Sequence, residues 1–193
     1  MGQHRNIVND DVGLNRMRRS PRGSALAYRS GVDGSRDYAL DFVGERVRSA
    51  AWGDVHLNVY TDTPTIADLD RLADAQRQLR HRREGNRLGV FSFAEAGFEM
   101  PSTDVRRHGA QLQSEMSPVI VASAVVVDGA GFWVSAAISV VNTIALLSRP
   151  SSPARVFRNI DDAAGWMARS MPVDPGALIS ATERLRGEPA APG

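Results

Sequence analysis

Hydrophobic and polar residues alternate in two short stretches of the chain. Residues 38–43 (YALDFV) and 55–60 (VHLNVY) both place apolar side chains at every second position. A period of two residues is typical of a strand with one drier and one wetter face. We therefore predict two neighbouring strands. Residues 44–51 between them are ambiguous, and fit a turn with the start of the next strand.

The pattern changes to helical spacing after Thr63. Thr63 can cap a helix by accepting a backbone N–H, and Pro64 suits the first helical position, where its missing N–H needs no partner. Apolar residues then recur at helical spacing up to residue 79, and arginines gather before Gly85, which ends the predicted helix. A second helix, with a weak apolar face, is predicted from a Ser102 cap to residue 116.

Longer apolar stretches predict elements inside the fold. Residues 88–94 (LGVFSFA) predict a strand, and residues 119–127 (VIVASAVVV) are apolar on both faces, as in a central strand covered on both sides. The uncharged stretch 131–147 is interpreted as a buried core helix and not a membrane span, because it is short for a span and strand-like segments flank it.

The end of the chain predicts an edge strand at 155–157, a core helix capped at 159–162 and a short helix at 176–185. The order β-β-α-β-α-β-α-β-α predicts an α/β fold with a mostly parallel sheet of about five strands and four crossover helices. We expect a single domain at 37–170. An N-terminal arm at 1–36 would precede it, and a C-terminal helical extension and tail at 171–193 would follow it.

Charge is unevenly distributed along the chain. All 23 basic residues are arginines, and residues 1–36 hold seven of them against three aspartates, whereas the remainder is mildly acidic. The arm has too few apolar residues to offset the entropy of ordering it, so we expect it to be disordered. Its arginines could bind nucleic acid or an anionic surface, but no nucleic-acid-binding fold follows, and a solvated arm is the preferred interpretation.

Several classes of chemistry lack the residues they need. Without cysteine, disulfides, thiolate catalysis and cysteine-containing metal sites are excluded. The four histidines (His4, His56, His81, His108) share no metal-ligand spacing, and we expect surface or boundary positions for them. No nucleophile–base pair, metal set or phosphate loop can be assembled, so we predict no enzyme activity, no cofactor and no metal. The first 30 residues contain no apolar secretory segment, which favours a cytoplasmic location.

The chain combines two alternating N-terminal strands with a strand and apolar helix at 119–147. It then closes with RVF at 155–157 and DAAGWM at 162–167. This combination resembles the STAS superfamily, and within it the SpoIIAA-like group of small bacterial domains. The resemblance covers residues 37–170 and implies a STAS-like fold in a cytoplasmic regulatory protein that binds other proteins.

The resemblance also points to residues 99–104 (EMPSTD). In the anti-sigma-factor antagonists of the superfamily, a partner kinase phosphorylates a serine of an Asp-Ser-Ser/Thr-Gly stretch at the start of the corresponding helix. Ser102 and Thr103 occupy that place, although the motif itself is absent. They are candidate phosphorylation sites, because a phosphate at a helix N-terminus meets free N–H groups and the positive end of the helix dipole. The alternative is that Ser102 is an ordinary N-cap.

A candidate ligand cleft follows the predicted central strand. Gly129 and Gly131 turn the chain into the apolar helix, and Trp133 lies at the junction between loop and helix. Open α/β folds bind ligands at the carboxyl ends of their strands, so these residues could line a small apolar cleft with the loop 97–101. The alternative is a tight β-α turn without a ligand.

These observations predict a non-enzymatic, STAS-like regulatory or protein-interaction module that engages a protein partner or a second copy of itself. The alternative function is a small-molecule or lipid-binding α/β domain that uses an apolar cleft near Gly129 to Trp133.

Overall fold

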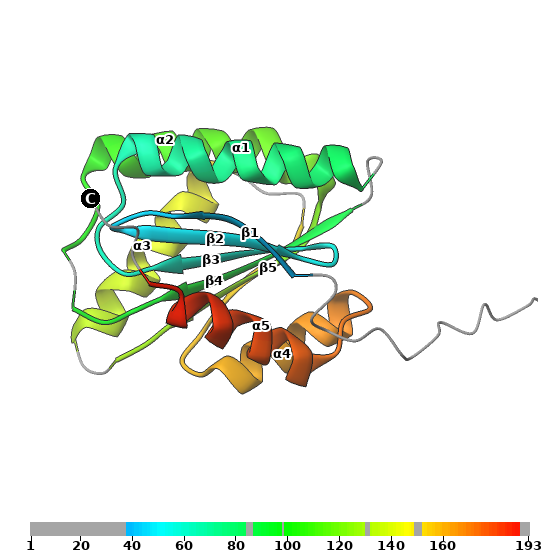
Figure 1. Cartoon of the computed structure of the whole chain (residues 1–193). Helices are drawn as coiled ribbons and strands as arrows, with labels where there is room; N and C mark the ends of the chain where they lie inside the picture. The colour runs from blue at the N-terminus through cyan, green and yellow to red at the C-terminus, as the bar shows by residue number, and fades with distance from the viewer. Residues whose placement is uncertain (1–37, 84–86, 98, 130–131, 149–151, 190–193) are drawn as a thin grey trace, which may run out of the picture. The chain divides into compact units, whose positions relative to one another are not determined.

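The computed structural model describes residues 38–83, 87–97, 99–129, 132–148 and 152–189, which hold six strands and five α-helices (Figure 1). The strands are β1 (Tyr38–Val43), β2 (Val47–Trp52), β3 (Val55–Tyr60), β4 (Leu88–Ala94), β5 (Ile120–Val127) and β6 (Ala154–Phe157). The helices are α1 (Ile66–Arg82), α2 (Thr103–Met116), α3 (Phe132–Ser148), α4 (Ile160–Ser170) and α5 (Pro175–Gly187), with a 3-10 turn at Ser117–Val119. The basic arm expected at 1–36 lies outside the described residues.

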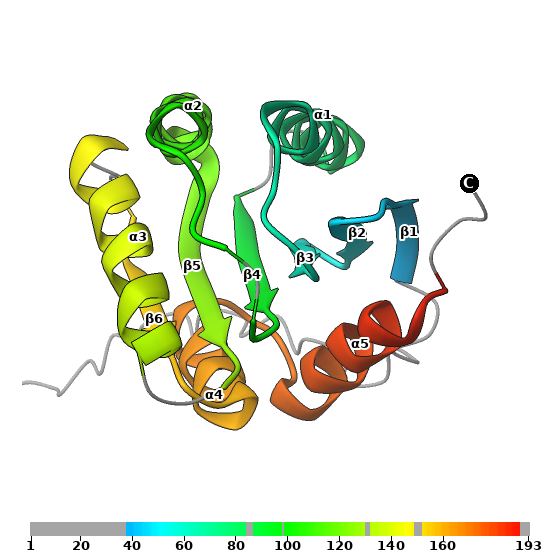
Figure 2. The same ribbon diagram turned by 90° about the vertical axis from the view of Figure 1, so that its left-hand side faces the viewer.

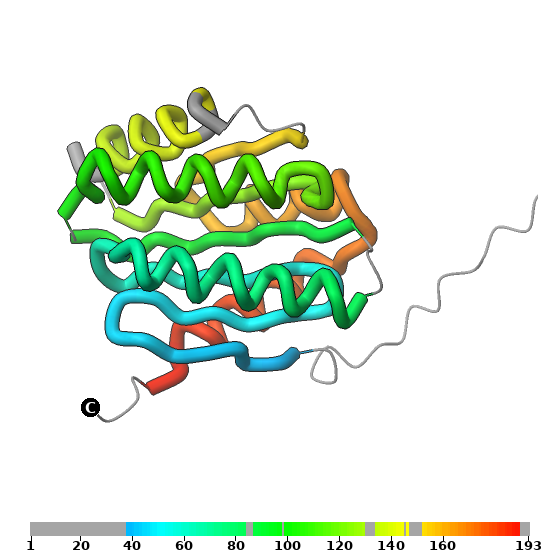
Figure 3. Tube along the Cα trace, turned by 90° about the horizontal axis from the view of Figure 1, so that it is seen from above, coloured from blue at the N-terminus to red at the C-terminus, as the bar shows by residue number. Residues whose placement is uncertain are grey.

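All six strands form one sheet in chain order, from β1 to β6 (Figure 3). The β1-β2 and β2-β3 pairs are antiparallel, and the pairs from β3 to β6 are parallel. The expected α/β fold with a mostly parallel sheet is confirmed, with six strands where about five were expected. The additional strand is β2, which occupies much of the ambiguous stretch. Its small residues Ser49, Ala50 and Ala51 hide the alternation of large apolar side chains that marks a strand.

The five helices divide between the two faces of the sheet (Figure 2). Helices α1, α2 and α3 each connect two adjacent parallel strands, and they lie on the same face, so the three crossovers share one hand. Helices α4 and α5 follow β6 and cover the opposite face. The expectation of four crossover helices is therefore wrong: no described strand follows α4.

The cap of α1 differs from the prediction. The N-cap is Thr65, whose hydroxyl accepts from the Asp68 backbone N–H while the Asp68 carboxylate accepts from the Thr65 backbone N–H. This reciprocal capping box satisfies two backbone N–H donors. A cap at Thr63 would satisfy fewer, because the residue three positions later is Ile66, whose side chain accepts no hydrogen bond. The Thr63 hydroxyl instead donates to the Glu99 carbonyl oxygen at 2.6 Å. The cap predicted at the start of α4 is confirmed, since Asn159 accepts from the Asp162 backbone N–H.

The main hydrophobic core lies between the sheet and the pair α4 and α5. Val55, Leu57 and Val59 of β3 belong to it and are fully buried. The two helices contribute Ala163, Ala164, Trp166, Met167, Leu178, Ala181 and Leu185. Residues 175–187, which the sequence suggested as an extension, are thus part of the same core as the sheet.

Helix α3 is less buried than predicted. Val134 and Ala137 are buried, but the apolar Leu146 is 77% exposed. The reason is that α3 packs mainly against α2 and makes few contacts with β5 and β6. The prediction of a buried core helix is therefore confirmed only in part: Val134 and Ala137 are buried, and Leu146 is exposed. None of the described helices combines the length and the apolar character that a membrane crossing requires.

The role of α5 in the core leads to a first prediction. Leu178→Ala should lower the free energy of unfolding by about 2–5 kcal/mol, because it removes a fully buried side chain and leaves a cavity. Leu146→Ala, at the exposed position on α3, should change it by less than about 0.5 kcal/mol. Urea denaturation followed by circular dichroism measures both. Equal effects of the two substitutions would contradict a core shared by α5 and the sheet.

Candidate functional site

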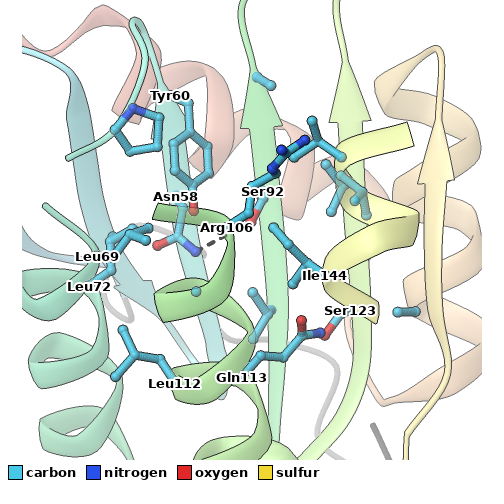
Figure 4. A pocket seen from close by; sticks show the side chains of 18 of the residues that line it. Asn58, Tyr60, Leu69, Leu72, Ser92, Arg106, Leu112, Gln113, Ser123 and Ile144 are labelled. Carbon is cyan, nitrogen blue, oxygen red and sulfur yellow. Dashed lines mark hydrogen bonds between the residues drawn. The ribbon is translucent and has the colours of Figure 1, made fainter. Parts of the chain in front are cut away.

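The face of the sheet under α1, α2 and α3 is filled less completely than the opposite face. Two separate, smaller apolar clusters lie there, one that includes Leu79 and Met116 and one that includes Val127 and Val134. Residues of both clusters line a cavity of about 280 Å³ between the sheet and the three helices (Figure 4). We call this space the helix-side cavity.

Most of the wall of the helix-side cavity is apolar. Its apolar side chains include Leu69 and Leu72 of α1, Val105 and Leu112 of α2, Val140, Val141 and Ile144 of α3, and Val90 and Val125 of the sheet. The volume of about 280 Å³ is nearly twice the roughly 150 Å³ of an engineered apolar cavity that binds benzene. The space therefore suits a molecule of about two fused rings.

The cavity exists because α2 and α3 supply little bulk over the centre of the sheet. The buried residues of α2 are Ala110 and Met116, and Gly109, which lines the cavity, has no side chain. Helix α3 packs against α2 more than against the sheet. The weak apolar face that the sequence showed for α2 thus leaves space in the folded protein.

Polar side chains lie on the sheet side of the helix-side cavity. They include His56 and Asn58 of β3, Ser92 of β4 and Ser123 of β5. Because side chains alternate along a strand, the even-numbered residues of β3 face the cavity while the odd-numbered ones face the main core. His56 is 1% exposed and Asn58 is 5% exposed. The expected surface or boundary position of His56 is therefore wrong, since helices cover the face that looked wetter in the sequence.

A chain of hydrogen bonds leads from His56 to the edge of the sheet. His56 Nε2 lies 2.9 Å from Ser49 Oγ on the neighbouring strand β2. The Ser49 hydroxyl donates to Asp41 Oδ2 over a long 3.4 Å. Arg82 Nη2 donates to the other carboxylate oxygen of Asp41 at 3.3 Å. The buried histidine is thus connected to an ion pair at the first strand.

Asp41 reaches Ser49 because β1 contains a bulge. Leu40 pairs with Ala50 and Phe42 pairs with Ser49, so Asp41 is an extra residue in the ladder. Bulges redirect side chains in this way. The Asp41 side chain is 9% exposed, and burial raises its pKa, although Arg82 acts in the opposite direction.

His56 is neutral near pH 7. Burial, with a smaller contribution from Arg82, lowers the pKa of His56 to about 4. A neutral imidazole carries one ring N–H. Because the Ser49 hydroxyl proton is directed to Asp41, Ser49 Oγ accepts from the Nε2–H of His56. The other ring nitrogen, Nδ1, is then an acceptor.

Two buried acceptors of β3 have no hydrogen-bond partner among the described residues. They are His56 Nδ1 and Asn58 Oδ1. The amide orientation of Asn58 is set on its other side, where Nδ2 donates to Ser92 Oγ at 3.4 Å (Figure 4). Buried polar groups are nearly always paired, and an unpaired one costs about 1–3 kcal/mol. Both residues line the helix-side cavity.

Arg106 carries the one ionised side chain among the described residues that line the cavity. Arg106 is labelled in Figure 4, and its Nη2 donates to Thr103 Oγ1, one turn earlier on the same helix, at 3.2 Å. No aspartate or glutamate lies in the described wall. A cation inside would therefore meet no carboxylate, and desolvation would oppose its entry.

The two candidate phosphorylation residues lie outside the helix-side cavity. Ser102 is the N-cap of α2, where its hydroxyl accepts from the Val105 backbone N–H at 3.4 Å, which confirms the cap. Thr103 follows it and accepts from Arg106. Both side chains are exposed. Phosphorylation of either stays a prediction.

The cleft predicted near Gly129 to Trp133 meets the observed cavity only in part. Gly129 has a φ of 106° and turns the chain after β5, but it does not line the cavity. Gly131 and the side chain of Trp133 lie outside what the structure describes, although Trp133 falls in the first turn of α3. From the loop 97–101, Met100 and Pro101 do line the cavity.

The sequence contained a signal for the polar side of the cavity. Ser92 and Ser123 interrupt two otherwise apolar strands, and His56 and Asn58 sit in an alternating strand beside them. Polar residues on successive strands of one buried face indicate a common polar site. His81 and His108, by contrast, lie at the surface or boundary as expected, and His108 Nε2 lies 2.6 Å from Asp70.

No group of histidine, aspartate and glutamate residues in the described ranges is arranged to hold a metal ion. No protein-family model matches the chain, and no curated protein matches its sequence. Membership of the STAS superfamily therefore stays a prediction.

The buried position of His56 predicts a pH dependence. The pKa is about 4 in the folded protein against 6.5 ordinarily, so protons bind the unfolded chain first as the pH falls. Stability linked to His56 is therefore fully present above pH 6.5 and is lost between pH 6.5 and 4. From pH 7 to 4, the wild type should lose about 3 kcal/mol more unfolding free energy than His56→Gln.

Urea denaturation at a series of pH values measures this difference. Asp41 is present in both proteins, so its own titration cancels to first order. Parallel pH profiles of the wild type and His56→Gln would show that His56 is accessible to solvent.

Proposed function

We propose that this protein is a non-enzymatic binding module whose helix-side cavity takes a small, largely apolar molecule. The observation that carries the proposal is the cavity of about 280 Å³, with its apolar wall, between one face of the sheet and α1, α2 and α3. Binding sites for small molecules are mostly apolar spaces with a few placed polar groups, and this cavity has that composition.

Energetics support the same proposal. A well-fitting apolar occupant removes the apolar side chains of the wall from water, which contributes about 25 cal/mol per Å² of apolar surface buried. The main core on the other face holds the sheet in place independently of this space. Strands β3, β4 and β5 therefore offer a rigid surface, against which a ligand can pack under the helices.

A STAS-like regulatory or protein-interaction role is our second proposal. It is supported by the element order and by the exposed apolar side chain of Leu146 on α3, which a protein partner or a second copy of the chain could cover. The two proposals are compatible, because α3 also forms part of the cavity wall through Val140, Val141 and Ile144.

Binding can be tested with 2-methoxynaphthalene, an apolar two-ring probe, by isothermal titration calorimetry. We expect one molecule to bind per chain. Ile144→Trp, which places bulk in the cavity, should weaken binding by roughly tenfold or more. Leu146→Trp, two residues along the same helix at an exposed position, should leave the affinity unchanged.

Circular dichroism provides the folding control for both tryptophan variants. The proposal fails if the wild type does not bind the probe, or if folded Ile144→Trp binds it as tightly as Leu146→Trp does.

A further inference from the structure

The two unpaired acceptors of β3 carry an inference about the chemistry of the ligand, which rests on the proposed function. We infer that the molecule in the helix-side cavity bears a neutral hydroxyl or N–H group that donates a hydrogen bond to Asn58 Oδ1 or His56 Nδ1. Both atoms are buried, both residues line the cavity, and neither atom has a partner among the described residues.

The structure sets the hydrogen-bonding role of each atom. Asn58 directs one N–H of its Nδ2 to Ser92 Oγ, and its carbonyl oxygen is left without a partner among the described residues. His56 donates its single ring proton toward Ser49, whose own proton goes to Asp41. Strand β3 therefore has two unused acceptors beside the cavity, and only a group that donates a hydrogen bond can satisfy them.

The position of these acceptors favours a group at a defined place on the ligand. His56 and Asn58 are two residues apart on one face of β3, so their Cα atoms lie about 6.6 Å apart along the strand. One hydroxyl can serve one of them, and a molecule with two donors can serve both. The apolar residues of α1, α2 and α3 surround the remainder of the ligand.

The donor group is neutral because the cavity lacks a counter-charge for a cation. Arg106 is in the described wall, and Arg82 lies beyond Asp41 on the side of His56. No described carboxylate lines the space. An ammonium group that entered the cavity would lose its hydration and lie near a guanidinium group. The free-energy cost of both exceeds what hydrogen bonds to Asn58 and His56 return.

Two matched probes test the inference: 2-naphthol, which has a hydroxyl donor, and 2-methoxynaphthalene, which has the same rings and an oxygen without a proton. Calorimetry on the wild type should show 2-naphthol binding roughly 5- to 100-fold more tightly, the range expected when a buried acceptor gains its partner. Asn58→Leu should reduce this preference strongly. Thr182→Val, a control at a buried polar position outside the cavity wall, should preserve it.

Nuclear magnetic resonance on the wild type gives a readout that needs no variant. The side-chain amide signals of Asn58 should shift with 2-naphthol more than with 2-methoxynaphthalene. Equal affinities of the two probes for the wild type, with no difference at Asn58, would overturn the inference and show that water serves these acceptors. If neither probe binds, the proposed function fails and the inference falls with it, which is a different result from equal binding.

Discussion

The alternation of side chains along β3 is the constraint on which the rest of the structure depends. Val55, Leu57 and Val59 form the centre of the main core with α4 and α5, and this fixes the opposite orientation for His56 and Asn58. A shift of the strand by one residue would exchange the two sets and destroy the core. The polar residues are therefore held on the helix-side face by the packing of their apolar neighbours.

The two faces of the sheet consequently have different roles: one forms the main core, and the other lines the helix-side cavity. Helices α4 and α5 bring small residues such as Ala163 and Ala164 close to the strands and complete a dense core. Helices α1, α2 and α3 pack on the other face through two separate apolar clusters. The helix-side cavity lies between these clusters, and Gly109 of α2, which has no side chain, lines it. A sheet supported on one side can carry acceptors in fixed positions on the other, which is what a selective binding site requires.

Much of the fold was predictable from local pattern, because alternation and caps are encoded by neighbouring residues. The stretches 38–43, 55–60 and 119–127 form strands nearly as expected, and Ser102 and Asn159 cap their helices. The misses depended on partners distant in sequence: the burial of His56 under α1 and its neighbours, and the half-exposed position of α3 against α2. The cavity was missed for the same reason, since no local pattern shows how completely three helices fill the space above a sheet.

The bulge at Asp41 has a consequence for the direction of hydrogen bonding inside the protein. Protons in the chain His56–Ser49–Asp41 all point outward, toward the carboxylate on the edge strand. With Asp41 turned away, Ser49 would be free to donate to His56 Nε2, and the imidazole would then carry its proton on Nδ1. One extra residue in a peripheral strand therefore sets the polarity of an interior surface. Substitutions in β1 could therefore change the preferred ligand from one that donates a hydrogen bond to one that accepts it, while the residues of the cavity wall stay the same.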